Sequence, residues 1–363
     1  GVGGPLMQER GLVGEAEMAQ LSVIGFGAAL TAYPKLSALA NHLVQRIIEE
    51  RPRAVITVDA KGFSLRLVAR LKKRMAAEKW SVPVIHVVAP TVWAWGAWRT
   101  KSVARAVDGL LCLFPFEVDY FTPHGVNARF IGHPEAFNNA LIPGKKDGRV
   151  TKRLLLLPGS RRSEVRRLLP LMRDAHRLLT LDRGAGASLT TTLVTVPHLL
   201  EEVSSILDDA NMSDKQNKTE INVACGRDAF YQHLHHADAM MAASGTVTLQ
   251  TALAGVPGVT CYRTSVLSAA IGRRLVRMDR VILPNALLGR EVYPFLFQEE
   301  ATASALAEHV EAILTVNGEK ISHEPAINSA LNNAYELRAL LRGGGDDNFE
   351  TRVARALAPY FQS

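Results

Sequence analysis

The stretch LLLLPGSRRSEV, residues 154–165, joins an apolar run to a charged turn and decides how the chain around it folds. Its four consecutive leucines fit a strand buried on both faces, as strands of parallel sheets are. Beyond the turn, Val165, Leu168, Leu169 and Met172 recur at helical spacing. A strand that turns directly into a helix leaves backbone N–H groups at the helix start, and these attract phosphate oxygens. The stretch therefore predicts an α/β fold with an anion site at this corner.

Two arginines strengthen that interpretation. Arg161 and Arg162 carry fork-shaped guanidinium groups that match the geometry of phosphate oxygens. A solvated helix start would have the same sequence, and these residues alone leave both interpretations open.

The rest of the chain alternates short β-branched runs with longer segments of helical spacing. Such alternation predicts parallel sheets with helices on both faces. Since nine strands are many for one open sheet, we expect two doubly wound domains facing a cleft, over 1–141 and 142–335, with a helical tail over 336–363. The candidate strands are 54–58, 84–88, 110–113, 128–132, 154–157, 191–196, 221–224, 239–243 and 258–262.

Composition describes an ordinary globular chain that can bury a core. Its 363 residues are 47% hydrophobic and 21% charged. A net charge of +7 and a pI near 9.4 suit an anionic partner, which leaves a phosphorylated substrate, an acidic membrane surface and nucleic acid open.

Cysteine usage and hydropathy bear on the compartment. Cys112, Cys225 and Cys261 are far apart and odd in number, which favours a reducing compartment over a disulfide framework. The longest mostly apolar run, 82–98, is shorter than the roughly 18–20 residues that a membrane-spanning helix needs. The N-terminus shows no pattern of a signal peptide.

A second strand–helix corner lies in ASGTVTLQTALAGVP, residues 243–257. Ser244, Gly245 and Thr246 turn the corner, and the helix that follows ends before a Gly and a Pro. Two hydroxyls and a helix start make another anion site, and Gln250 lies one turn along on the face of Thr246. A capped helix packed on a sheet is the alternative.

Other ligand motifs are absent from the sequence. There is no G-x-x-x-x-G-K-[ST] and no complete G-x-G-x-x-G after a strand, which disfavours ATPases and dinucleotide oxidoreductases. His233, His235 and His236 lie close together, but no second cluster with ligand spacing accompanies them. We therefore expect no metal and no cofactor.

Five further polar residues are candidates for ligand contact. Asp59 ends a strand and could act as a general base or as a helix N-cap. His133 follows another strand, where a packing role competes with ligand contact. Asn285, Arg290 and Glu291 gather in a loop between apolar runs, which fits ligand contact or an ion-paired turn.

The segment 21–44 is more apolar than a surface helix needs. An exposed patch of this kind suits lipid contact. Ile24, Phe26, Leu30 and Tyr33 are the candidate membrane-facing residues.

Taken together, these motifs resemble the lipid-A-disaccharide synthases, bacterial glycosyltransferases of the two-domain GT-B type. Their order and spacing along nearly the whole chain are specific, although no single motif is. The stretches that carry the resemblance are GVGGPLM (1–7), PTVWAWGAWRTKSVARAVDGLLCLFPFE (90–117), FIGHP (130–134), LLPGSRRSEV (156–165), ASGTVTLQTALAGVP (243–257) and LPNALLGRE (283–291).

The resemblance implies an inverting, metal-independent transfer of 2,3-diacylglucosamine from UDP-2,3-diacylglucosamine to the 6-hydroxyl of 2,3-diacylglucosamine 1-phosphate. The products would be a β-1′,6-linked disaccharide 1-phosphate and UDP. It further implies action at the cytoplasmic face of the inner membrane, acyl chains at the apolar segment 21–44, a C-terminal tail that packs on the N-terminal domain, and a homodimer that exchanges C-terminal helices.

The resemblance also assigns roles to residues. Ser160 and Arg161 would hold the UDP diphosphate, and residues 244–246 match a nucleotide-contacting turn. Asp59 matches an essential Asp and is the candidate base, while Asn285 matches an essential Asn.

The chain departs from the family pattern at three places. In the family pattern, a first strand and an acidic glycine loop precede the position that corresponds to Gly1. Gln250 stands where the family has a Glu that would bond the ribose hydroxyls, and charge-assisted bonds are about twice as strong as neutral ones. The family's Asp-Ala-Pro-Asp-Phe reads DAKGF at 59–63.

These departures keep alternatives open. One is a GT-B relative with a changed donor or acceptor, and another is a catalytically weak, membrane-bound protein that still binds nucleotide or lipid. A nucleic-acid binder would explain the positive charge but not two phosphate corners, so no nucleic-acid partner is expected.

Overall fold

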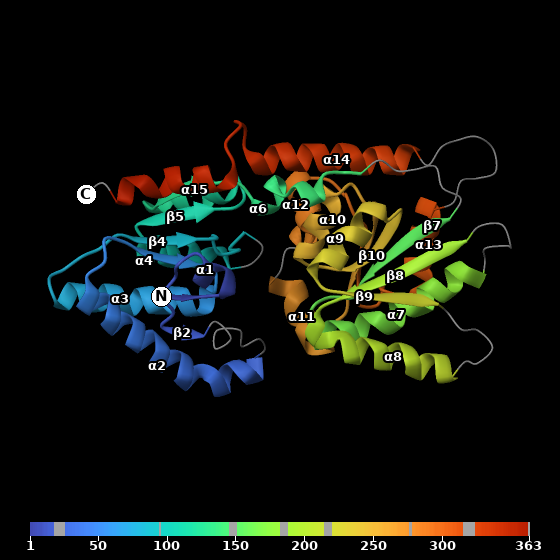
Figure 1. The fold of residues 1–363 in the computed structure, drawn as a ribbon, viewed down its shortest axis with the longest axis horizontal. Helices are drawn as coiled ribbons and strands as arrows, with labels where there is room; N and C mark the ends of the chain where they lie inside the picture. The colour runs from blue at the N-terminus through green and yellow to red at the C-terminus, as the bar shows by residue number, and fades with distance from the viewer. Residues whose placement is uncertain are drawn as a thin grey trace. The chain divides into compact units, whose positions relative to one another are not determined.

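The computed structural model describes residues 1–17, 26–93, 96–144, 151–181, 188–213, 220–275, 278–314 and 324–361 (Figure 1). Its contacts divide the chain into two compact units. Unit 1 comprises Gly1–His133 and Gly345–Ser363, and unit 2 comprises Pro134–Gly344.

Unit 1 is built on a parallel sheet in which β3, β4, β5 and β6 follow one another in chain order. A separate parallel pair, β1 with β2, precedes it. The strands of the unit are β1 (Val2–Gly3), β2 (Ala16–Glu17), β3 (Val55–Val58), β4 (Val84–Val87), β5 (Gly109–Cys112) and β6 (Asn127–Phe130).

Helices cover both faces of this sheet because successive strand residues point to opposite faces. Val84 and Leu110 are buried with α2, α3 and α4, whereas their neighbours Ile85 and Leu111 are buried with α15. The C-terminal helix α15 is therefore part of the unit 1 core. The helices are α1 (Pro5–Glu9), α2 (Phe26–Glu50), α3 (Lys61–Ala77), α4 (Thr100–Ala106), α5 (Glu117–Phe121) and α15 (Phe349–Leu357).

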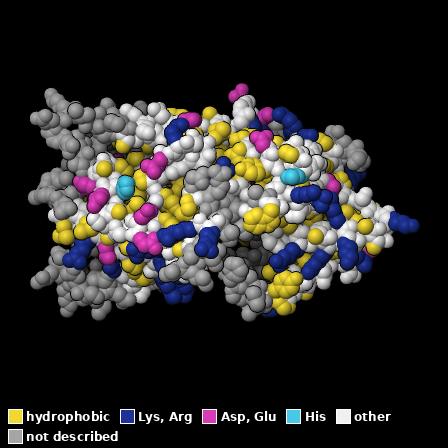
Figure 2. Space-filling model, turned by 180° about the vertical axis from the view of Figure 1, so that it is seen from behind, with side chains coloured by type: hydrophobic (Ala, Val, Ile, Leu, Met, Phe, Trp, Pro, Cys, Tyr) yellow, Lys and Arg dark blue, Asp and Glu magenta, His cyan; other side chains and the backbone are white. Residues whose placement is uncertain are grey.

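Basic side chains gather on helix α3 of unit 1. Helix α3 carries them without any acidic residue, and Figure 2 shows Lys and Arg side chains spread over the surface of this unit. The basic residues of α3 are Lys61, Arg66, Arg70, Lys72, Lys73 and Arg74.

Unit 2 is a doubly wound sheet. Its parallel strands lie in the order β12-β11-β10-β7-β8-β9, so the chain starts in the middle, at β7, and winds first to one edge and then to the other. The switch point, between β7 and β10, is where such sheets bind ligands. The strands are β7 (Lys152–Leu157), β8 (Leu189–Thr195), β9 (Ile221–Cys225), β10 (Ala239–Ala243), β11 (Gly258–Tyr262) and β12 (Phe295–Phe297).

The helix predicted after the PGSRR turn is confirmed. Val165, Leu168, Leu169 and Met172 of α7 are fully buried, and α8 and α13 cover the same face of the sheet. Each such side chain stabilises the fold by about 1.5–3 kcal/mol. The helices of the unit are α6 (Pro134–Phe137), α7 (Arg162–Leu181), α8 (Leu200–Ser213), α9 (Arg227–His236), α10 (Thr246–Leu253), α11 (Val266–Leu275), α12 (Leu283–Leu288), α13 (Ala303–Leu314) and α14 (Glu324–Arg342).

All nine predicted strands are present, with ends shifted by at most a few residues. Strands β1, β2 and β12 were not predicted from the sequence, because they are too short to show alternation.

The division between the units falls earlier than the expected 141–142, and α14 belongs to unit 2 rather than to a separate tail. Hydrogen bonds explain the difference. Arg338 of α14 donates to the carbonyl oxygens of Ala136 and Leu141, both at 2.6 Å, which ties residues 134–141 to unit 2.

None of the helices in the described parts of the chain is long and apolar enough to cross a membrane.

Candidate active site

The main candidate site is a cavity of about 840 Å³ at the switch point of unit 2. Strand ends of β7, β8 and β10 open onto it, together with the starts of helices α7, α9 and α10. All six residues that the sequence predicted to bind the donor line this cavity, namely Ser160, Arg161, Ser244, Gly245, Thr246 and Gln250.

The corner after β7 needs a glycine. Gly159 has φ +109°, and a Cβ at this position would lie 2.5 Å from Oε2 of Glu164. Glu164 in turn orders the corner, because its Oε2 accepts a hydrogen bond from the backbone N of Arg161 (3.3 Å) and its Oε1 pairs with the guanidinium group of the same residue. Arg161 keeps 56% of its side chain exposed, so its charge can still meet an anion in the cavity.

At the corner after β10, no side chain caps the start of α10, so its backbone N–H groups are available to a ligand. Gly245 is the N-cap of α10, and the hydroxyl of Thr248 donates to its carbonyl oxygen at 2.7 Å. The first N–H groups of a helix have no partner within the helix. Because β7 and β10 are neighbours in the sheet, two helix starts face one cavity, and both favour negative charge there.

Apolar and aromatic side chains also line the cavity. Residues 194–197, at the end of β8, lie there with Phe230 and Tyr231 of α9. Arg227 donates to the hydroxyl of Tyr231 at 3.2 and 3.3 Å, and its guanidinium group lies 5.5 Å from the ring centroid. A planar base fits such a wall, and phosphates fit the two corners.

Glu135 also lines this cavity, although the sequence did not single it out. Its Oε1 accepts a hydrogen bond from Nε2 of Gln250 at 2.9 Å, and its Oε2 accepts one from Nδ2 of Asn138 at 3.2 Å. Glu135 directly follows the FIGHP stretch, but no local pattern distinguishes it from a surface glutamate.

Asp59 lies in unit 1, at the corner where β3 ends. Its side chain is exposed. It does not cap the next helix: the N-cap of α3 is Ala60, which makes no side-chain bond, and Asp59 contributes its carbonyl oxygen to the hydroxyl of Ser64 at 2.8 Å. Asp59 and Ala60 both have positive φ, +44° and +43°, a conformation that costs about 1–2 kcal/mol for a residue with a Cβ.

Two buried titratable residues near this corner were also missed. His86 of β4 is fully buried, and its Nδ1 lies 2.8 Å from the hydroxyl of Thr57. Burial lowers the pKa of His86 to about 4, although the charge of Asp59 acts in the opposite direction. Burial raises the pKa of Glu117 to about 7, against the lowering effect of hydrogen bonds from Phe114 and Trp93. Only burial, which sequence spacing does not report, distinguishes these two groups.

Asn285 and Arg290 of the LPNALLGRE stretch form hydrogen bonds with other residues of unit 2. The Oδ1 of Asn285 accepts hydrogen bonds from the backbone N of Val292 and of Tyr293, both at 3.0 Å, and its Nδ2 donates to the carbonyl oxygen of Tyr293 at 2.8 Å. Arg290 donates to Asn333 (2.8 Å) and pairs with Glu336.

Asn285, Arg290 and Glu291 are not among the residues that line the cavity. Asn285 holds the loop after α12 in place, Arg290 joins that loop to α14, and the side chain of Glu291 is exposed.

The remaining predicted residues lie in unit 1. His133 stacks on Phe114, with 5.4 Å between ring centroids. Tyr33 of α2 is 49% exposed, and the guanidinium group of Arg66 lies 5.4 Å from its ring centroid. Ile24 lies outside the described residues, and so do the side chains of Phe26 and Leu30.

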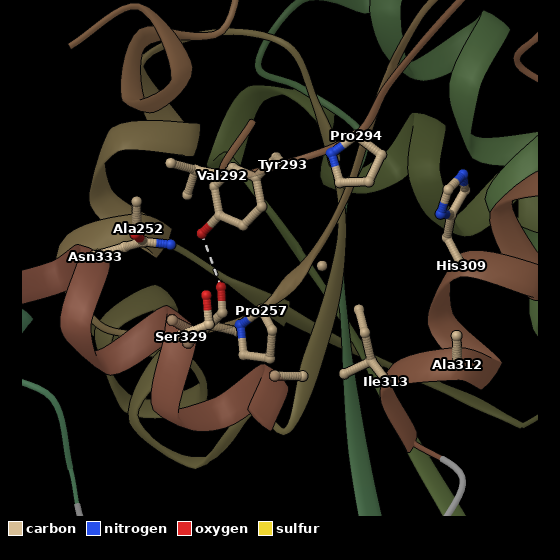
Figure 3. A pocket seen from close by; sticks show the side chains of 14 residues that line it. Ala252, Pro257, Val292, Tyr293, Pro294, His309, Ala312, Ile313, Ser329 and Asn333 are labelled. Atoms are coloured by element: carbon tan, nitrogen blue, oxygen red, sulfur yellow. Dashed lines mark hydrogen bonds between the residues drawn. The ribbon is translucent and has the colours of Figure 1, made fainter. Parts of the chain in front are cut away.

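A second cavity of unit 2, of about 330 Å³, lies between α10, α13, α14 and the segment 292–294 (Figure 3). Its lining is mostly apolar, and the hydroxyl of Tyr293 points to one side of it, where it donates to the carbonyl oxygen of Val256 at 2.7 Å. Among the described residues that line it, His309 of α13 is the titratable one.

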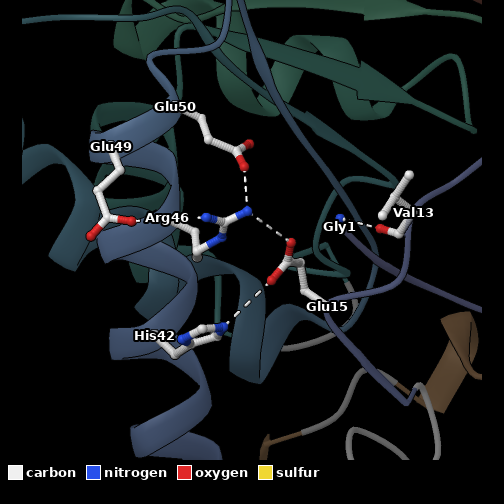
Figure 4. A network of polar contacts seen from close by, with 7 residues as sticks. All are labelled: Gly1, Val13, Glu15, His42, Arg46, Glu49 and Glu50. Carbon is white, nitrogen blue, oxygen red and sulfur yellow. Dashed lines mark hydrogen bonds and ion pairs between the residues drawn. The ribbon is translucent and has the colours of Figure 1, made fainter.

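A polar cluster joins the N-terminal segment of unit 1 to α2 (Figure 4). Arg46 pairs with Glu15 (3.3 Å) and with Glu50, while His42 lies 3.5 Å from the other carboxylate oxygen of Glu15. The hydrogen bond from Arg46 holds the pKa of Glu15 below its usual value. Within the described residues, no three His, Cys, Asp or Glu side chains gather as a metal site would require.

Comparison with known proteins bears on this geometry. The sequence model of the lipid-A-disaccharide synthetase family matches residues 1–339. The lipid-A-disaccharide synthase of Anaeromyxobacter dehalogenans (strain 2CP-1) is 36% identical over 367 aligned residues, covering 98% of this chain and 87% of that protein. Its counterpart in Chromobacterium violaceum is 32% identical over 364 residues, covering 98% and 88%.

A solved structure with a similar fold is that of MurG from Acinetobacter baumannii, with a TM-score of 0.50 at 14% identity, covering 99% of this chain and 90% of that chain. A likeness at this identity shows the fold, which is the GT-B type with two Rossmann-like units.

Proposed function

The chain belongs to the lipid-A-disaccharide synthase family, and from that premise we propose how its residues carry out the reaction. The chain is a glycosyltransferase that uses a nucleotide sugar. It transfers 2,3-diacylglucosamine from UDP-2,3-diacylglucosamine to the 6-hydroxyl of 2,3-diacylglucosamine 1-phosphate. The observation that carries this proposal is the cavity at the switch point, where both strand–helix corners lie beside a wall suited to a base.

In this proposal the cavity binds the UDP part of the donor. The diphosphate lies at the two corners, where the starts of α7 and α10 and the hydroxyls of Ser160, Ser244 and Thr246 meet it. As the bond between the anomeric carbon and the phosphate oxygen breaks, Arg161 offsets the negative charge that develops on UDP.

Asp59 is the proposed base. The oxygen of the acceptor's 6-hydroxyl attacks the anomeric carbon from the face opposite UDP, its proton passes to the carboxylate of Asp59, and UDP leaves with the bonding electron pair. The configuration at the anomeric carbon inverts. The exposed carboxylate and the strained backbone at this corner both support the assignment.

Asn285 is a positioning residue in this scheme. Its amide makes three hydrogen bonds that hold the loop 289–293, and it therefore acts through that loop rather than on the donor.

We further propose that unit 1 contacts the cytoplasmic face of the inner membrane. Exposed Tyr33 beside Arg66, together with the basic residues of α3, suits a surface of anionic headgroups. The chain acts as a homodimer in which α15 is exchanged between subunits. Positive φ at Gly343, Gly344 and Gly345 gives a break before α15 that supports such an exchange.

A turnover assay tests the reaction. The chain is incubated in detergent with UDP-2,3-diacylglucosamine and 2,3-diacylglucosamine 1-phosphate, and disaccharide and UDP are both quantified. We expect equal amounts of the two products, loss of both in Asp59→Ala, and normal turnover in Asp119→Ala, which removes an exposed carboxylate from α5 of the same unit. Release of UDP without disaccharide, or full activity of Asp59→Ala, would contradict the proposal.

A further inference from the structure

Glu135 and Gln250 form a hydrogen-bonded pair at one side of the donor cavity. They lie on different helices, α6 and α10, and are 115 positions apart in the sequence. Nε2 of Gln250 donates to Oε1 of Glu135 at 2.9 Å, and Nδ2 of Asn138 donates to its Oε2 at 3.2 Å. Both carboxylate oxygens are therefore held in a defined orientation, while the side chain is only half-buried and lines the cavity.

The pair connects the two ends of the cavity. On one side, Gln250 lies one helical turn beyond Thr246, at the corner assigned to the diphosphate. On the other side, Asn138 also donates to the hydroxyl of Tyr231, at 3.0 Å, in the wall assigned to the base. In a nucleoside diphosphate the ribose lies between the base and the diphosphate, and so it falls beside Glu135.

The chemistry of the cavity also selects Glu135. Among the described residues that line it, the acidic side chains are Glu135 and Glu164. Glu164 is 6% exposed and engaged by the backbone and the guanidinium group of Arg161. The 2′- and 3′-hydroxyls of a ribose are neighbouring donors, and an ionised carboxylate is a pure acceptor with two oxygens.

We propose that Glu135 accepts hydrogen bonds from the 2′- and 3′-hydroxyls of the donor's ribose, with Gln250 holding the carboxylate in place. The assignment rests on the proposed nucleotide site. It accounts for the neutral side chain at position 250, because α6 supplies the carboxylate in its stead. It makes Glu135 the residue by which the cavity selects ribonucleotides over deoxyribonucleotides.

Calorimetric titration of the full chain with UDP, 2′-deoxy-UDP and 3′-deoxy-UDP tests the assignment. Because bonds to a charged acceptor are strong, we expect the wild-type chain to bind UDP about ten- to hundredfold more tightly than either deoxy analogue. Glu135→Gln keeps the size of the side chain and removes its charge. It should weaken UDP most and each deoxy analogue, which keeps one of the two hydroxyls, by a smaller factor, so that the preference for UDP falls to within a factor of a few.

Two further variants separate recognition from support of the fold. In the exchanged pair Glu135→Gln/Gln250→Glu, one carboxylate and one amide still meet, and the preference for UDP should return. Glu308→Gln removes an exposed carboxylate from α13 of the same unit and should leave all three affinities unchanged.

The outcomes distinguish the ribose assignment from the nucleotide site on which it rests. If the wild-type chain binds UDP and 2′-deoxy-UDP equally, or if Glu135→Gln keeps the preference or weakens all three ligands alike, the ribose assignment is wrong and the nucleotide site stands. If the wild-type chain binds none of the three ligands, the nucleotide site is wrong and the ribose assignment falls with it.

Discussion

The corners that end the strands differ between the two units. In unit 2, the turns after β7 and β9 place glycines, Gly159 and Gly226, at positive φ, where no side chain is strained. In unit 1, the turns after β3 and β4 place Asp59, Ala60 and Val88 at positive φ, although each has a Cβ. These corners are thus relaxed in unit 2 and strained in unit 1, whereas the turn after β12 of unit 2 places Gln298 at φ +55° and the turn after β6 of unit 1 places Gly132 at φ +91°.

The difference follows from what each corner offers a ligand. A diphosphate is bound largely by backbone N–H groups, and glycine lets the backbone approach it closely. In the proposed mechanism Asp59 is the proton acceptor, a role that needs a side chain, and its corner therefore cannot use glycine. Strained residues of this kind persist where function requires them.

The largest expected effect separates chemistry from binding. Asp59→Asn should lower kcat about 10²- to 10⁴-fold, because the base is lost, and should leave the affinity for UDP within a factor of about two. Arg161→Ala should instead weaken UDP binding about ten- to hundredfold, since a charge-assisted contact to the diphosphate is lost. Steady-state kinetics with UDP titration measures both. A large change in UDP affinity in Asp59→Asn would contradict the assignment of catalysis to the corner of Asp59 and of UDP binding to the corner of Arg161.

Next in size is the pH dependence of stability. His176 of unit 2 is buried against Thr191, and burial lowers its pKa to about 4. Because folding lowers the pKa of His176, protonation favours the unfolded state at acid pH. The free energy of unfolding is unaffected above about pH 6.5 and decreases as the pH falls towards 4, by up to about 3 kcal/mol. His176→Gln should remove this loss. Denaturant unfolding at pH 4.5 and pH 7.5 measures it, and exposed His198→Gln serves as the control.

Unit 1 should respond less to acid over the same range. His86 behaves as His176 does, but Glu117 acts in the opposite direction. Its pKa is raised to about 7, so stability falls as the pH rises from about 4.5 to 7, when the unfolded state is ionised and the folded state is not. A steeper acid loss in Glu117→Gln than in the wild-type chain would show this compensation, and an unchanged slope would exclude it.

The glycine corners offer a smaller effect. Gly159→Ala should destabilise unit 2 by about 2 kcal/mol or more, because the new Cβ has a positive φ and also meets Glu164. Gly226→Ala has a similar φ, +95°, but no atom within 4 Å of its Cβ, and should cost only about 1 kcal/mol. Thermal unfolding of the two variants gives the difference. Equal costs would mean that the Glu164 side chain yields without penalty.

The smallest effect concerns the strain at Asp59. Asp59→Gly should raise the free energy of unfolding by about 0.5 kcal/mol, since relief of the positive φ exceeds the entropy that glycine loses on folding, while activity is abolished. Asp119→Gly, in helix α5, should instead lower it by about 0.5–1 kcal/mol. A loss of stability in Asp59→Gly would show that this corner is not strained.

Much of the fold could be predicted because the pattern that specifies it is local. Apolar runs of β-branched and leucine residues marked nine strands, and helical spacing placed Val165, Leu168, Leu169 and Met172 in the core. The two strand–helix corners were visible for the same reason, since glycine, serine and arginine stand next to the strand that they follow.

The rest depended on which distant segments become neighbours. No pattern within β7 or β10 states that these strands pair, yet their pairing places Ser160 and Thr246 on one cavity. Asn285 looked like a ligand residue from its loop, whereas its amide is used by the backbone of Val292 and Tyr293.

The sequence by itself therefore determined the α/β class, the positions of the strands and the residue types at both strand–helix corners, because neighbouring residues dictate these. Only the tertiary structure decided the strand order that creates the switch point, the burial that shifts the pKa values of His86 and Glu117, and the meeting of Glu135 with Gln250. These features depend on contacts between residues far apart in the chain, and local spacing carries no record of such contacts.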